Sequence, residues 1–194
     1  DGRIRMFRPE ENAKRLQRSA HYLGIEAPST EMFIEMCERC IKENEEFLPP
    51  YEATGASLYL RPTLIGSNPQ LGVQSSKEST FMILCSPVGA YVGGALDAVD
   101  VVIARNYDRA APNGSGSFKV GGNYACSLRS LNIAHEQGYK AVLYLDPSTK
   151  TLVDEFNSSN FFGIKGNKYI TPKSDSILPS ITNMSLETVA AHLG

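Results

Sequence analysis

A single lysine stands among glycines in the segment GSGSFKVGGNY, which covers residues 114–124. Lys119 supplies a primary amine, and Tyr124 supplies a phenol five residues later. A lysine amine that loses its proton can attack an aldehyde and form a Schiff base. Glycines let the backbone approach a flat ligand closely, because no Cβ intervenes. The segment is therefore typical of a site rather than a linker, and Schiff-base chemistry is one candidate for it.

Two other interpretations of this lysine compete with the first. A nucleotide-binding P-loop places its lysine directly after the last glycine, with serine or threonine next. Here two residues separate Gly116 from Lys119, and Val120 follows the lysine, so the P-loop interpretation fails. Most lysines lie at the surface and are exposed to solvent. Spacing alone does not decide whether Lys119 is such a surface lysine or a reactive amine.

Cysteine and histidine give no metal-binding pattern. Cys37 and Cys40 form a lone CxxC pair on the apolar side of a predicted helix. A structural zinc site would need a second pair of ligands, so packing in the core is the better interpretation. His135 and Glu136 lack the second histidine that the helix of a metalloprotease carries. We therefore expect no metal ion.

Composition excludes several classes of partner. The chain has 194 residues and a net charge of -2, which gives no electrostatic reason to expect nucleic acid or an anionic membrane. No apolar run reaches the roughly 20 residues that a membrane span needs. The sequence starts at Asp1 without a methionine, and we expect it to be a piece of a longer chain.

The first half of the sequence predicts two helices followed by two strands. Proline in a first turn marks a helix that begins near Pro9, and Gly24 ends it. Ser29 is the expected cap of the second helix. Apolar stretches then predict strands over residues 57–65 and 81–85. In the first strand Leu58 and Leu60 share one face, so Tyr59 and Arg61 share the other.

The second half predicts strands that alternate with helices. The expected strands cover residues 99–104, 141–145, 153–162 and 168–171, and Gly166-Asn167 indicates a hairpin between the last two. A helix after the lysine segment is expected to turn Leu128, Leu131 and Ala134 inward. A last helix is expected to place Leu186, Val189, Ala190 and Leu193 on one face.

A glycine-rich join over residues 87–94 is the expected domain boundary. We predict a small domain over residues 1–91 and a larger domain over residues 92–194. The class is mixed α and β.

Five segments of the chain resemble branched-chain amino acid aminotransferases. They are KVGGNYA at residues 119–125, DGRIRMFRP at 1–9, SLYLRPTLIG at 57–66, PVGAY at 87–91 and ILPSIT at 177–182. Each is moderately specific, and all five occur in the order of the family. The resemblance implies the two-domain, D-amino acid aminotransferase-like architecture of fold-type IV enzymes that use pyridoxal 5'-phosphate. A small α/β domain and a larger β-rich domain would enclose the cofactor between them.

The resemblance also implies a role for individual residues. Lys119 would hold the cofactor as a Schiff base and move a proton at the substrate Cα. Tyr124 would bond the phenolic oxygen of the cofactor, and Glu155 would pair with its ring nitrogen. The residues alone do not distinguish Glu155 from Asp154 in this role. The cofactor phosphate would be bound by Arg15 and by the backbone amides of Ile181 and Thr182, at a helix start that favours anions.

Substrate contacts are implied for Tyr59, Arg61 and Tyr91. An apolar pocket with tyrosine walls would accept leucine, isoleucine or valine, and one arginine would bind the γ-carboxylate of glutamate. For Tyr59, packing on the sheet is as good an interpretation as substrate contact. The sequence departs from the family at Ser180, where glycine is usual, and at residues 156–159.

The resemblance therefore implies amino transfer from branched-chain amino acids to 2-oxoglutarate, in a homodimer in the cytoplasm of a bacterium. Other fold-type IV activities stay open, namely those of D-amino acid aminotransferases and aminodeoxychorismate lyases. A scaffold without chemistry is a further alternative. Chains of the family extend beyond both ends of this sequence, so we expect this piece alone to be inactive.

Overall fold

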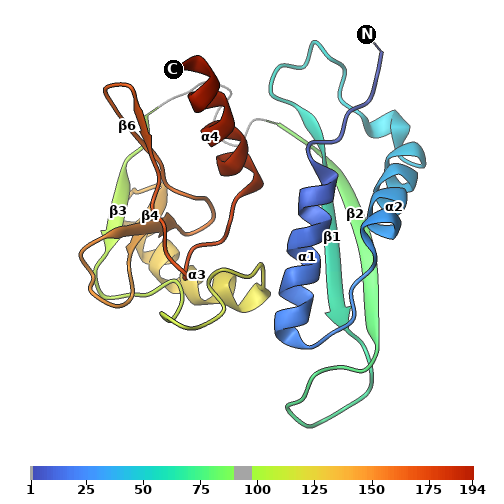
Figure 1. Cartoon of the computed structure of the whole chain (residues 1–194), viewed down its shortest axis with the longest axis horizontal. Coiled ribbons are helices and arrows are strands. Elements are labelled where there is room, and N and C mark those ends of the chain that lie inside the picture. The colour runs from blue at the N-terminus through green and yellow to red at the C-terminus, as the bar shows by residue number, and fades with distance from the viewer. Residues whose placement is uncertain (1, 90–97) are drawn as a thin grey trace. The chain divides into compact units, whose positions relative to one another are not determined.

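The computed structural model describes residues 2–89 and 98–194 (Figure 1). It divides the chain into two compact units, Asp1–Ala98 and Val99–Gly194. The domain boundary expected between residues 91 and 92 lies outside the described residues and stays a prediction. Both units combine helices and strands, as the sequence predicts. None of the helices in the described part of the chain has the length and the apolar character that crossing a membrane requires.

Two helices open the first unit. Helix α1 spans Pro9–Leu23 and ends at Gly24, whose φ of 66° is a left-handed conformation that glycine adopts easily. Helix α2 spans Thr30–Lys42, and the Ser29 hydroxyl accepts a hydrogen bond from the Met32 amide at 3.1 Å. The predicted helix ends are confirmed because proline, glycine and a serine cap act locally. A short 3-10 helix, η1, follows over Glu45–Phe47.

A two-stranded antiparallel sheet completes the first unit. Strand β1 spans Ser57–Gly66 and pairs with β2 over Ser79–Val88. Leu60 packs against buried Phe33 and Cys37 of α2, whereas Tyr59 and Arg61 are exposed. The alternation predicted for this strand is confirmed. Cys37 lies in the core, where burial raises the pKa of its thiol to about 11, so it acts as a packing residue.

A three-stranded sheet organises the second unit. Strand β3, Val101–Ala104, runs parallel to β4, Ala141–Leu145, and helix α3, Gly121–Glu136, connects them. Strand β5, Val153–Phe156, pairs antiparallel with β4, so the order is β3-β4-β5. Buried Ala134 of α3 packs with Val142 and Tyr144 of β4. The lysine segment thus connects a sheet strand to a helix that packs on the sheet.

A hairpin and a helix follow the sheet. Strands β6, Gly163–Lys165, and β7, Lys168–Ile170, form a hairpin at the predicted turn, in which Gly166 has a φ of 58°. Helix α4 spans Ile181–Leu193. The continuous strand predicted over residues 153–162 is wrong. After Phe156 the chain turns back, because the Phe156 amide donates to the Ser159 carbonyl at 2.9 Å.

Helix α3 buries a polar side that the sequence did not indicate. Leu128, which the apolar pattern predicts inside, is 56% exposed. The buried residues are Asn123, Ser127, Ser130 and Ala134, spaced at three and four residues along one face. Each of the two serines donates to a carbonyl one turn earlier, so the hydroxyls are satisfied without water. A polar stripe usually marks the solvent face, which is why the predicted orientation of Leu128 is wrong.

Candidate active site

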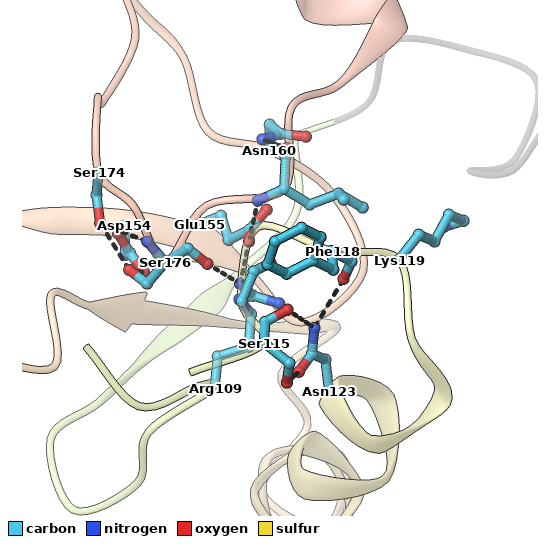
Figure 2. Close-up of polar contacts among 12 residues, drawn as sticks. Arg109, Ser115, Phe118, Lys119, Asn123, Asp154, Glu155, Asn160, Ser174 and Ser176 are labelled. Atoms are coloured by element: carbon cyan, nitrogen blue, oxygen red, sulfur yellow. Dashed lines mark hydrogen bonds and ion pairs between the residues drawn. The ribbon is translucent and has the colours of Figure 1, made fainter. Parts of the chain in front are cut away.

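Lys119 and Tyr124 meet at the start of α3. The lysine amine donates a hydrogen bond to the Tyr124 hydroxyl at 2.6 Å and lies 4.9 Å from the centre of the tyrosine ring. Tyr124 lies five positions after Lys119, in the first turn of the helix, and Lys119 lies in the loop before it. The Lys119 side chain is exposed and extends away from the buried cluster beside its loop (Figure 2).

Glu155 on β5 is a buried carboxylate with one oxygen fixed. Arg109 lies 2.6 Å from its Oε1, and the Leu178 amide donates to the same oxygen at 3.1 Å. The other oxygen, Oε2, accepts no hydrogen bond from the described residues. Burial raises the pKa of Glu155 to about 7, since the loss of water outweighs the opposing charge of Arg109. The carboxylate can therefore take a further N–H donor.

The neighbouring Asp154 has a different surrounding. It is 2% exposed, and its Oδ2 accepts a hydrogen bond from the Ser176 hydroxyl at 2.8 Å. The positive charges of Arg109 and, more weakly, Lys119 both lower the pKa of Glu155. Geometry thus separates two adjacent acids that the residues alone did not: Asp154 bonds Ser176, and Glu155 pairs with Arg109.

Arg109 is the residue of this site that sequence reasoning missed. Its guanidinium group is buried, and Nη2 donates to the Gly116 carbonyl at 3.0 Å as well as to the Ser176 carbonyl. With the ion pair to Glu155, one side chain connects the lysine loop, strand β5 and the segment before α4 (Figure 2). Nothing in its sequence position distinguishes Arg109 from exposed Arg105, so no local signal could have found it.

The start of α4 lies close in sequence to this cluster. Ile181 and Thr182 are the first two residues of the helix, as predicted, and Leu178, which bonds Glu155, lies three residues before it. Ser180, where the resembling family has glycine, caps the helix: its hydroxyl accepts from the Asn183 amide at 3.1 Å. A helix start with a positive dipole end suits an anion.

Three glycines near Lys119 differ in what surrounds them. A Cβ on Gly116 would lie 2.2 Å from the Ser176 carbonyl oxygen, so the packing of the chain itself requires glycine there. A Cβ on Gly121 or Gly122 would meet no neighbouring atom within 4 Å among the described residues. Alanine is the better helix former at such positions. The packing of the described residues therefore does not explain Gly121 and Gly122, which leave open space beside the lysine.

The remaining predicted site residues belong to the first unit or lie outside the described residues. Arg15 is half-buried on α1, and its Nη2 donates to Asn12 Oδ1 at 3.4 Å. The Arg61 guanidinium group lies 5.4 Å from the centre of the Tyr59 ring, so the structure brings these two together on β1. Tyr91 lies outside the described residues.

The family model for amino-transferase class IV matches residues 1–194, the whole of the sequence. The chain belongs to the class IV aminotransferase family. Among curated relatives, the branched-chain-amino-acid aminotransferase of Haemophilus influenzae is 50% identical to this chain, over 98% of the chain. The enzyme of that name from Helicobacter pylori is 49% identical to it, over 97% of the chain. The chain spans 57% and 56% of the lengths of these two relatives.

Solved structures show that the chain has part of the fold-type IV architecture. It is similar to the branched-chain amino acid aminotransferase of Escherichia coli, with a TM-score of 0.81 and 29% identity, over 97% of this chain and 60% of that one. The branched-chain amino acid aminotransferase of T.th., solved with pyridoxamine 5'-phosphate, matches with a TM-score of 0.80 and 26% identity over the same shares. The fold class expected from the sequence is confirmed.

Proposed function

We propose that the full-length protein containing this chain transfers the amino group of leucine, isoleucine or valine to 2-oxoglutarate, with pyridoxal 5'-phosphate as cofactor. The names of the two relatives at 50% and 49% identity support the reaction. The observation that carries the proposal is the pairing of the Lys119 amine with the Tyr124 hydroxyl at 2.6 Å, in the unit that also holds buried Glu155.

The residues of the second unit fit the chemical groups of that cofactor. When bound, pyridoxal 5'-phosphate supplies an aldehyde that a lysine amine captures and a ring that accepts electrons from the bonds at the substrate Cα. Lys119 offers the amine, Tyr124 a phenol for the ring oxygen, and Oε2 of Glu155 an acceptor for a ring N–H. A Cβ on Gly121 or Gly122 would meet no described atom within 4 Å, which leaves room for part of a flat ligand against this backbone. Each of these assignments is part of the proposal.

We also assign Lys119 the role of general acid and base. A primary amine held by a hydrogen bond can take a proton from the substrate Cα as a general base and give it back as a general acid. The Tyr124 hydroxyl orients that amine, since the two atoms lie 2.6 Å apart. Glu155, with its pKa of about 7, can keep its negative charge when a positively charged N–H group approaches, because the pairing lowers the pKa.

The phosphate and the substrate are assigned to the residues that the resemblance implies. We assign the phosphate to Arg15 and to the amides of Ile181 and Thr182, where the start of α4 favours an anion. We assign substrate contact to Tyr59, Arg61 and Tyr91. Arginine can bind the γ-carboxylate of glutamate with two parallel hydrogen bonds, and tyrosine rings can cover the apolar side chain of leucine. The homodimer and the cytoplasmic location stay predictions.

A two-substrate assay tests the proposed function. The full-length protein, supplied with pyridoxal 5'-phosphate, is expected to convert leucine and 2-oxoglutarate to the branched-chain oxo acid and glutamate, and to leave D-alanine unused. Lys119→Ala should abolish the reaction, whereas Lys140→Ala, which changes another exposed lysine of the second unit, should not. Preference for D-alanine, or full activity of the Lys119 variant, would overturn the proposal.

A further inference from the structure

We propose that Asn123 positions Lys119, an inference that rests on the proposed role of this lysine. Asn123 is the third residue of α3 and is 5% exposed. Its Nδ2 donates to the Phe118 carbonyl at 2.9 Å and to the Ser115 carbonyl at 2.8 Å. Its Oδ1 accepts from the Ser115 hydroxyl at 2.6 Å. Figure 2 shows this side chain bonded to Ser115 and Phe118 of the loop that carries the lysine.

The bond to Phe118 acts directly on Lys119. The carbonyl of Phe118 and the amide of Lys119 belong to one planar peptide group, so a fixed carbonyl fixes the plane from which the lysine side chain departs. Tyr124 follows Asn123 in the helix. The same residue therefore connects the backbone of the lysine to the turn that holds the tyrosine, and it sets the 2.6 Å contact between amine and phenol.

These contacts are not those of a helix cap. A capping side chain accepts hydrogen bonds from the free amides of a first helical turn. Val120 occupies the cap position of α3 and makes no such bond with its side chain. The Asn123 amide bonds two carbonyls and one hydroxyl of the preceding loop instead. Asn123 therefore fixes the loop, and this loop carries Lys119.

The chemistry of the site requires an amide at this position. An asparagine side chain has two N–H donors and one carbonyl acceptor, and all three functions are used here. Aspartate has nearly the same shape but no donor when ionised, so its oxygen would face two carbonyl oxygens in a buried place. Asn123→Asp therefore removes the positioning contacts with little change in volume. Asn132→Asp makes the same change at an exposed site of the same helix and is the matched control.

Borohydride trapping in the full-length protein tests the inference. The lysine amine and the aldehyde of pyridoxal 5'-phosphate combine with loss of one water, and borohydride supplies the hydride that makes the bond permanent. Peptide mapping then gives the rate of trapping at Lys119 and, as an internal reference, at Lys140. We expect Asn123→Asp to lower the rate at Lys119 at least about tenfold, as loss of two buried hydrogen bonds implies. The rate of trapping at Lys140 should be the same in all variants. The Asn132→Asp protein should be trapped at Lys119 as fast as the unaltered protein.

The outcomes separate the two proposals. If the unaltered protein is not trapped at Lys119, the proposed role of the lysine fails and the inference fails with it. If the unaltered protein is trapped there and Asn123→Asp is trapped as fast, only the inference is overturned. Should Asn123→Asp not fold, Ser115→Ala removes just the bond to Oδ1, and we expect a loss of roughly threefold at an unchanged melting temperature. An unchanged rate in Ser115→Ala would then overturn the inference.

Discussion

Arg109 Nη2 lies 2.6 Å from Glu155 Oε1, and both side chains are almost completely buried. The pair joins residues that are 46 positions apart in the chain. An ion pair in such a place gives little net stability, because both charges lose their water, but breaking it leaves one charge buried without compensation. The same guanidinium group also holds the Gly116 carbonyl of the lysine loop. Removing Arg109 should therefore affect both stability and the site.

Arg109→Met is expected to lower the free energy of unfolding by about 3–5 kcal/mol above neutral pH. Without the arginine the pKa of Glu155 rises further, so the carboxyl group is neutral at and below neutral pH, and the loss of stability is smaller there. Urea unfolding at several pH values measures both effects. The matched control is Arg105→Met, an exposed arginine in the same stretch, which should change stability by no more than roughly 0.5 kcal/mol. Equal, small losses in both variants would mean that the ion pair does not form.

The pKa of Glu155 predicts how stability depends on pH. Its value in the folded chain is raised from 4.5 to about 7, so the folded state binds more protons than the unfolded state between these values. Stability from this group is present at low pH and is lost as the pH rises through 7. Compared with Glu155→Gln, which cannot ionise, the unaltered chain should lose on the order of 3 kcal/mol across this range. Thermal melts of both proteins from acidic to mildly alkaline pH measure it, and parallel pH curves would contradict the assignment.

Two glycines of the lysine segment should respond in opposite ways to alanine. Gly116→Ala places a Cβ against the Ser176 carbonyl and should destabilise the chain by on the order of 2 kcal/mol. Gly122→Ala fills open space in a helical turn and should stabilise the ligand-free chain by up to about 1 kcal/mol. If the cofactor uses that space, the second variant should nevertheless bind pyridoxal 5'-phosphate more weakly. Melting temperatures with and without the cofactor test this, and a Gly122→Ala protein with unchanged cofactor affinity would show that the space is not used.

Arg61 is expected to affect the kinetics with glutamate and not those with leucine. If its guanidinium group binds the γ-carboxylate of glutamate, Arg61→Ala should raise KM for glutamate at least about tenfold and leave leucine unchanged. Steady-state kinetics with each amino donor measures the difference. Arg39→Ala, at an exposed position on α2, is the control for loss of a surface charge in the same unit. Equal losses with both donors would mean that Arg61 supports the sheet through its contact with Tyr59.

Local signals predicted a large part of the fold. Gly24 ends α1 and Ser29 caps α2, because these residues act on the backbone at their own positions. The alternation along β1 correctly separates Leu60 from Arg61, since one face of that strand packs on the helices. The spacing of Lys119 and Tyr124 was likewise a local feature, and the structure brings the two side chains together.

What the sequence did not predict depends on contacts between distant segments. Arg109 pairs with Glu155, which lies 46 positions later in the sequence, and the periodicity of apolar residues does not predict such a pair. Leu128 is predicted inside because apolar residues usually mark the buried face, but α3 satisfies buried serines and Asn123 through hydrogen bonds instead. The strand predicted over residues 153–162 ends at Phe156 because the chain turns onto the Ser159 carbonyl.

The most direct test of the central claim is the site of cofactor attachment. The full-length protein is incubated with pyridoxal 5'-phosphate, reduced with borohydride and mapped by peptide mass spectrometry. We predict one stoichiometric adduct, on Lys119, which disappears in Lys119→Ala together with the visible absorbance of the bound cofactor, while Lys140→Ala keeps both. An adduct that maps to another lysine, or absorbance and turnover that persist in Lys119→Ala, would contradict the account.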